Sequence, residues 1–380
     1  MVRQAANSLC LAALSWLATG CSDGSDQTLL LPPDLPGVAE GTPAFLGFPE
    51  RAEDWADSPR LLSQTLGFED LASLRPSRGL LPYAVQSPLF SDGAGKQRWL
   101  ALPSGTKIGF SETGAWTYPE GTVFVKQFDM ALDERHPEQL RRLETRFLVA
   151  ASGGSFYGLS YVWNAEQTDA ELSRDGHDEV LQIVGADGTP RAQTYSFPAQ
   201  ADCARCHSNV AGGALGPRTA QLNGEFEYTG GDGEPFIANQ LAIWGQLGFF
   251  DRPVAGAGRL SAYPRLSDLR DPTQPVEQRI RSYWDSNCSM CHNADSPIPS
   301  WDARYSTKLE RQGLLDAESY AGPRSDGLRL IVPGDPDRSL MVLRSSSTDP
   351  RLRMPPLLRN AVDTEYVELL RSWIASLPAR

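Results

Sequence analysis

Two short stretches of the chain share one pattern of cysteine and histidine, and they constrain its fold more than any other feature. Residues 203–207 read CARCH and residues 288–292 read CSMCH, so both follow the pattern Cys-x-x-Cys-His. The chain of 380 residues holds only 6 cysteines and 4 histidines, which makes a chance repeat of this pattern negligible. The fold must therefore present two thiols and one imidazole together at two separate places.

This pattern is the attachment sequence of c-type haem, in which two thiols form thioether bonds and the adjacent histidine binds the iron. Zinc is one alternative, but a zinc site built on the cysteine pairs does not need a histidine directly after each pair. A redox disulfide is another, but neither motif has thioredoxin-like surroundings. We predict two covalently attached c-type haems, bound by Cys203, Cys206 and His207 and by Cys288, Cys291 and His292.

The first twenty residues have the plan of a signal peptide, with Arg3, an apolar run over 9–17 and small residues directly before Cys21. The run is too short to remain in a membrane as a span. Small residues followed by cysteine resemble a bacterial lipoprotein signal, which implies that Cys21 is acylated. Ala18 stands where such signals usually carry leucine, so simple secretion is the alternative. We expect a lipoprotein on the periplasmic side of a bacterial membrane, with the outer membrane favoured, or a secreted or periplasmic chain if Cys21 is not lipidated.

Charge limits the partners. The net charge of −12 argues against nucleic acid, whose binding proteins need basic surfaces to displace counterions from phosphates. Cys10 lies in the signal peptide and Cys21 is the lipid site, so no cysteine is left over for a structural disulfide. The expected partners are redox proteins and, through the lipid anchor, the membrane.

The order of alternating, proline-rich and helical segments along the chain predicts an α+β multidomain protein. Short alternating segments at 98–102, 122–128, 143–150, 156–163 and 180–184 predict antiparallel strands. Proline and glycine are dense near the N-terminus and over 252–275, as in linkers. The predicted parts are a signal peptide (1–20), a tether and lead-in (21–80), an antiparallel β-rich domain (81–200), a loop and helix segment for the first haem (201–251), a linker (252–275) and an all-α, cytochrome c-like domain with the second haem (276–380).

Three apolar stripes with helical spacing complete this division. The first, which we expect near the first haem, is formed by Ile237, Leu241, Trp244 and Gly248. A second helix over 276–284 leads into the second motif, and a third, capped by Asp363 or Thr364, closes the chain. A helix entering the motif and a closing helix resemble the small cytochrome c domain.

Each haem iron needs a second axial ligand if it is only to pass electrons. For the second haem we predict Met354, on a proline-stiffened loop before the last helix, over its competitor Met341. For the first haem the residues leave several choices open. The candidates are His136, His177, Met130, Met341 or no ligand at all.

Charged residues in the predicted strands raise two further points. Alternation places Lys126 on the same face as Phe124 and Phe128, and we interpret it as a lysine at a sheet edge. The alternative is a weak similarity to small periplasmic haem proteins in which a lysine is crosslinked to the macrocycle. Alternation also places Arg142, Glu144 and Arg146 on one face. They could form a row of ion pairs, reach haem propionates or lie on a solvated face.

The chain resembles a family of bacterial dihaem c-type lipoproteins. The resemblance rests on both Cys-x-x-Cys-His motifs and the Met354 loop, with weaker matches at 88–94, 142–146, 160–164, 221–223 and 239–241. It implies haem binding and electron transfer, with no substrate specified.

Two functions follow as hypotheses. In the first, a tethered dihaem cytochrome passes single electrons between redox partners. In the second, a haem enzyme with an open first haem acts on a small molecule such as peroxide or a nitrogen oxide, and the dihaem peroxidases are the nearest model. The first is favoured, because Met354 is an evident ligand and no catalytic acid or base stands out.

Overall fold

A computed structural model describes residues 46–230, 233–254, 257–296, 301–319 and 328–378. The predicted signal peptide and Cys21 lie outside these residues. Within them the chain is mainly β, with 23% helix. No helix in these ranges is long and apolar enough to cross a membrane.

The centre of the molecule is a six-stranded antiparallel sheet whose strands follow each other in chain order. Each strand pairs with the next one in sequence, although the connections over 83–94 and 102–122 are longer than hairpin turns. The strands are β3 (Leu81–Pro82), β4 (Gly95–Ala101), β5 (Val123–Ala131), β6 (Leu140–Ala150), β7 (Phe156–Trp163) and β8 (Ala170–Ser173).

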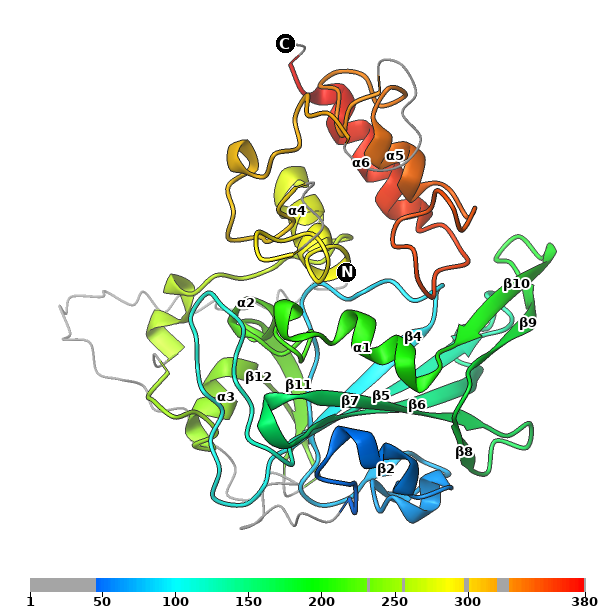
Figure 1. Cartoon of the computed structure of the whole chain (residues 1–380), viewed down its shortest axis with the longest axis vertical. Coiled ribbons are helices and arrows are strands. Elements are labelled where there is room, and N and C mark those ends of the chain that lie inside the picture. Colours follow the sequence, from blue (N-terminus) through cyan, green and yellow to red (C-terminus); the bar gives the residue numbers. More distant parts are fainter. Residues whose placement is uncertain (1–45, 231–232, 255–256, 297–300, 320–327, 379–380) are drawn as a thin grey trace, which may run out of the picture.

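Three two-stranded sheets and a set of helices surround this central sheet (Figure 1). The small sheets pair β1 (Phe68–Asp70) with β2 (Arg75–Pro76), β9 (His177–Val184) with β10 (Pro190–Phe197) and β11 (Glu225–Thr229) with β12 (Pro235–Asn239). The α-helices are α1 (Gln200–Cys206), α2 (Thr219–Leu222), α3 (Gln240–Gln246), α4 (Val276–Asn287), α5 (Leu340–Ser345) and α6 (Thr364–Ser376). The 3-10 helices are η1 (Ala52–Asp57), η2 (Leu62–Gln64), η3 (Ser152–Gly154), η4 (Asn209–Ala211), η5 (Ala257–Ala262) and η6 (Leu309–Arg311).

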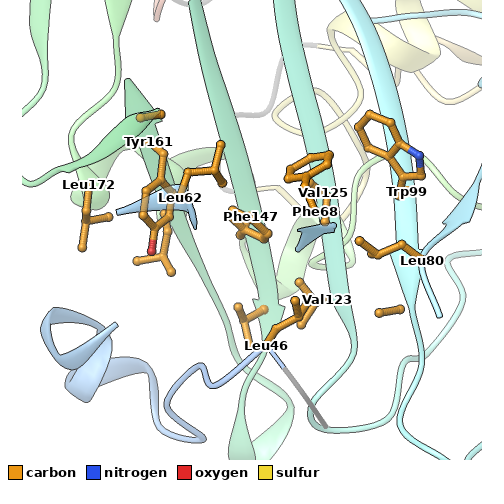
Figure 2. Packing of buried hydrophobic residues seen from close by; sticks show 14 of the residues in the cluster. Leu46, Leu62, Phe68, Leu80, Trp99, Val123, Val125, Phe147, Tyr161 and Leu172 are labelled. Atoms are coloured by element: carbon orange, nitrogen blue, oxygen red, sulfur yellow. The ribbon is translucent and has the colours of Figure 1, made fainter. Parts of the chain in front are cut away.

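One face of the central sheet packs on residues 46–80, which the sequence analysis assigned to a tether and lead-in. Val123, Val125 and Phe147 from the sheet meet Leu62 and Phe68 from this segment in one buried cluster (Figure 2). The segment, blue in Figure 1, lies beneath the sheet. Burial of these apolar side chains, each worth roughly 1.5–3 kcal/mol, fixes the segment to the sheet.

The opposite face of the sheet points toward the helices. Phe124 and Leu148 join an aromatic cluster with Trp116 and with Trp244 of α3. Further along the same strands, this face lies below α1, and the C-terminal helices α4, α5 and α6 lie above it in Figure 1. The central sheet is therefore covered on both sides.

The predicted all-α, cytochrome c-like domain over 276–380 is wrong. Helices α4, α5 and α6 occur there, but irregular chain separates them in the described part. Isolated β-bridges pair Leu315 with Ile331 and Arg329 with Ser339. The physical reason is that helical stripes occupy only the two ends of this region, whereas prolines and glycines such as Pro333 and Gly334 interrupt its middle.

The predicted helix over 237–248 is also shorter than its apolar stripe. Ile237 belongs to strand β12 and its side chain is 65% exposed. Helix α3 begins only at Gln240, because the Asn239 side chain caps it by accepting a hydrogen bond from Leu241 N. It packs in the aromatic cluster and does not line the cavity described below.

Candidate functional site

Helix α1 carries the first Cys-x-x-Cys-His motif and rests directly on strand β7. The Asp202 carboxylate accepts a hydrogen bond from Ala199 N at 3.1 Å and so caps the first turn. A Cβ atom on Gly158 of β7 would lie 2.5 Å from Cys203 Sγ, closer than real atoms pack. Glycine at this position therefore allows the helix and its first cysteine to come down onto the sheet.

His207 ends helix α1 with a fixed ring orientation. Its Nδ1 lies 2.7 Å from the Gly213 carbonyl oxygen, and because a carbonyl only accepts, the ring must donate from Nδ1. Burial, and next the Lys126 ammonium, lower the pKa of His207 to about 3. The imidazole is thus neutral, with the lone pair on Nε2, which is the form that binds a metal ion.

The second motif follows helix α4 without a break, as its sequence predicts. His292 N donates to Cys288 O at 2.8 Å, and the first motif has the same bond from His207 N to Cys203 O at 2.9 Å. The His292 ring stacks on Trp301, with 5.2 Å between the ring centroids. Burial lowers the pKa of His292 to about 4, so this imidazole is also neutral.

The end of α4 is tied to the β-rich part of the chain. Ser286 Oγ donates to Ser87 O at 2.7 Å, and Asn287 Oδ1 accepts from Phe90 N at 2.8 Å. The Asp285 carboxylate pairs with Arg218, which directly precedes α2. These bonds hold the second motif against a loop that leads into the central sheet.

Both motifs line one cavity of about 530 Å³. Burial raises the pKa of Cys206 and the Cys291 thiol raises it further, while Arg205 opposes the rise at Cys291, so the two motifs lie within electrostatic range. The volume falls in the usual range of a site for one small molecule or cofactor. The six predicted attachment residues all line it, namely Cys203, Cys206, His207, Cys288, Cys291 and His292.

The four thiols are unpaired and poorly ionised. All four cysteines are free. Burial raises the pKa of each thiol, that of Cys288 to about 12. A folded chain therefore keeps these side chains as neutral thiols at physiological pH.

The cavity separates the candidate axial ligands into two groups. Met354 and Met341 both line it, and Met354 N donates to Arg344 O at 3.1 Å, which fixes its loop to α5. Of the other candidates, Met130 is buried in a separate core cluster, His136 lies on the exposed turn after β5, and His177 stacks on Phe197 at the start of β9. None of these three lines the cavity.

Lys126 does face the cavity together with Phe124 and Phe128, as the alternation of β5 predicts. The interpretation as an edge lysine is wrong, because β5 lies inside the sheet between β4 and β6. Burial, with Arg98 and Arg146 nearby, lowers the pKa of Lys126 to about 7. Arg98 was missed in the sequence analysis, although alternation along β4 could have placed it on a face of the sheet.

The predicted row of Arg142, Glu144 and Arg146 is wrong in one member. Glu144 and Arg146 form an ion pair on the cavity side. The pairing of β5 with β6 shifts between Phe128 and Asp129, so that Leu143 is an extra residue and the alternation reverses there. Arg142 consequently lies on the other face, where its guanidinium donates to Leu71 O at 2.7 Å.

Glu144 is the centre of a buried polar cluster beside the first motif. Its side chain has no exposed area and accepts hydrogen bonds from Tyr195 Oη at 2.8 Å and from Ser160 Oγ at 2.5 Å, as well as pairing with Arg146. Every oxygen of this carboxylate is thus engaged. Glu144 is therefore fully used within the protein.

Comparison with protein-family models, with curated proteins and with solved structures finds no match to this chain.

Proposed function

We propose that the protein is an extracytoplasmic dihaem c-type cytochrome that passes single electrons between redox partners. The observation that carries this proposal is the convergence of both Cys-x-x-Cys-His motifs on one cavity that also holds Met354. Residues 203–207 and 288–292 are separated by eighty residues of sequence, yet the fold brings them to a shared site. Two cysteine motifs with separate roles would not need to line the same cavity.

The side chains of the cavity suit this cofactor. His207 is held as the neutral tautomer with Nε2 available, and its hydrogen bond to Gly213 is the outer contact that orients metal-binding histidines. The four thiols are free to form thioethers, and Phe124, Phe128 and Trp301 give part of the wall an aromatic lining. When bound, each haem would supply a one-electron couple, which is what a relay requires.

Haem content tests the proposal. The mature protein, purified from a host that attaches c-type haem, should keep haem through denaturing gel electrophoresis and contain two per chain by the pyridine haemochrome assay. Cys203→Ala with Cys206→Ala should leave one haem, and so should Cys288→Ala with Cys291→Ala. In the wild-type protein, ferric-state electron paramagnetic resonance should show two low-spin centres. A protein without covalent haem would end the proposal.

Met354 is the proposed sixth ligand of the second haem. Met354→Ala should abolish the near-infrared absorption band of methionine-ligated ferric haem. Met341→Ala is the matched control, because Met341 lines the same cavity from helix α5. If the band survives in Met354→Ala and is lost in Met341→Ala, the two methionines have the opposite roles.

A second candidate function is a haem enzyme whose first haem has an open face. It is favoured by one observation: of the candidate ligands of the first haem, His136, His177 and Met130 all lie away from the cavity, and only Met341 lines it. A peroxidase-like or nitrogen-oxide reaction would need such a face. A high-spin ferric signal that shifts on addition of cyanide would support this function over a simple relay.

The lipid anchor is proposed from Cys21 and the residues before it. Growth with radiolabelled palmitate should label the wild-type chain but not Cys21→Ser. Both forms should carry the same haem content, since Cys21 is not part of either motif. Absence of label from both forms would leave secretion without an anchor.

A further inference from the structure

Three cationic side chains stand in a row across the cavity face of the central sheet. Arg98 on β4 is paired directly with Lys126 on β5, and Lys126 is paired directly with Arg146 on β6. Directly paired residues point to the same side of a sheet. All three line the cavity, as does Lys96, two residues before Arg98. With strands about 4.8 Å apart, the row spans roughly 10 Å.

Such a row opposes folding unless something compensates it, because like charges directly opposite each other repel. The neighbouring acids are already engaged. Glu144 bonds to Arg146, Ser160 and Tyr195. Asp92, which acts on Lys96, accepts hydrogen bonds from Asn360 N and Ala361 N. The cations of this wall therefore outnumber the acids that face them.

The row also holds donors that the described chain does not use. Lys126 makes no hydrogen bond and no ion pair with any residue that the structure describes. Arg146 Nε is buried without an acceptor. Arg98 donates only a long bond, 3.4 Å from Nη1 to Lys96 O. All three residues line the cavity from directly paired positions of neighbouring strands.

This part of the cavity is its thiol end. Lys126 interacts electrostatically with Cys203, Cys206 and His207, and Arg146 interacts with Cys203. We propose that Arg98, Lys126 and Arg146 form a binding site for one small free oxyanion, of the size of sulfate or nitrite, beside the first Cys-x-x-Cys-His motif. Guanidinium and ammonium groups bind such oxygens through charge-assisted hydrogen bonds.

The carboxylates of a c-type haem are the other anions that a wall like this could meet. They are carried on the edge of the macrocycle opposite the thioether bonds, whereas Lys126 and Arg146 of the row interact with the thiol of Cys203 itself. The free anion is therefore the better match. Its negative charge would offset the repulsion that, with burial, lowers the pKa of Lys126 to about 7.

An anion site goes beyond electron transfer, since a relay needs no small-molecule ligand. It uses the same cavity as the proposed function but is built from side chains of the sheet. Haem content and anion affinity can therefore fail separately. A purified protein without haem that binds sulfate would refute the proposed function alone, and a dihaem protein that binds no sulfate would refute this inference alone.

The test is isothermal titration calorimetry of the mature holoprotein with sodium sulfate, at constant ionic strength and at a pH below 7, where Lys126 carries its proton. Sodium nitrite is the second probe. We expect one saturable site per chain. Lys126→Met should weaken it by roughly tenfold or more, the effect of losing one charged hydrogen bond, whereas Lys126→Arg should retain most of the affinity.

Lys308→Met is the matched control. Lys308 is exposed and does not line the cavity, so its loss should leave sulfate affinity unchanged. Arg98→Met is a second variant that should weaken binding if Lys126→Met proves to be unfolded by circular dichroism. Absence of saturable binding to the wild type, or equal affinity in wild type, Lys126→Met and Arg98→Met, would overturn the inference.

Discussion

The contact between helix α1 and strand β7 depends on Gly158, and replacing this glycine tests the packing that positions the first motif. In Gly158→Ala the new Cβ would lie 2.5 Å from Cys203 Sγ and 2.6 Å from Cys203 Cβ. Carbon atoms out of bonding contact normally stay about 3.5–4.0 Å apart. Helix and strand must therefore separate locally by about 1 Å.

Neither Gly158 nor Cys203 can move easily. Gly158 is paired with Leu148 in the sheet, and Cys203 O accepts the bond that ends α1 at His207. Overpacking of this kind destabilises proteins by about 1–3 kcal/mol. We therefore expect Gly158→Ala to lower the free energy of unfolding by that amount, measured by guanidinium denaturation of the mature protein with tryptophan fluorescence.

Gly95→Ala is the matched control in the same sheet. Its Cβ would meet only Asp129 O, at an ordinary 3.7 Å. Glycine to alanine in a strand without a clash is neutral or stabilises by about 0.5–1 kcal/mol. Equal denaturation midpoints for the two variants would show that α1 is not seated on β7 through Gly158.

Three further predictions concern the polar parts of the cavity. Glu144→Gln should lower the free energy of unfolding by about 3 kcal/mol, because it leaves Arg146 buried without its counter-ion. Tyr195→Phe removes only one hydrogen bond to Glu144 and should lower it by about 1 kcal/mol. Similar losses for the two variants in urea denaturation would argue against a central role for the ion pair. Lys126→Met should remove a pH dependence of stability. The pKa of Lys126 is about 7 in the folded chain and 10.5 ordinarily, so between these pH values the unfolded chain binds one more proton than the folded chain. The free energy of unfolding of the wild type should therefore rise with pH across this interval, relative to that of Lys126→Met. A stability difference that stays constant from pH 7 to 10.5 would contradict this sign. The Asp92 carboxylate accepts hydrogen bonds from Asn360 N and Ala361 N. Asp92→Ala should therefore loosen this loop, and limited proteolysis should cut there faster than in the wild type.

The sheet was largely predictable from the alternating side chains along its strands. The segments that cover its two faces were not. Alternation along β5 correctly grouped Lys126 with Phe124 and Phe128. The other face of the same strand carries Val123 and Val125, so both faces are apolar, which is a sign that both are covered. That sign could have shown that part of the segment over 21–80 packs on the sheet.

Two errors arose where local pattern and three-dimensional pairing disagree. The extra residue Leu143 reverses the alternation of β6, and nothing in the sequence marks this bulge. The apolar stripes of α4 and α6 suggested a helical domain, yet the chain between them lacks helical periodicity. The two Cys-x-x-Cys-His motifs that line the cavity were visible in the sequence, since their spacing is local, whereas Arg98 and Gly158 reach the site only through strand pairing.

On the proposed function, the buried thiols also imply an order of events in making this protein. The thiolate is the reactive form of cysteine, and with the pKa of Cys288 near 12 only about one molecule in 100,000 would carry it at neutral pH. The walls of the cavity come from segments as far apart as Tyr83 and Tyr366, which meet only once the chain has folded. On the proposed function, both cofactors must therefore be joined to the open chain, and the sheet and helices close around them afterwards. On the same proposal, a chain that folds first would have to unfold again before its thiols could react.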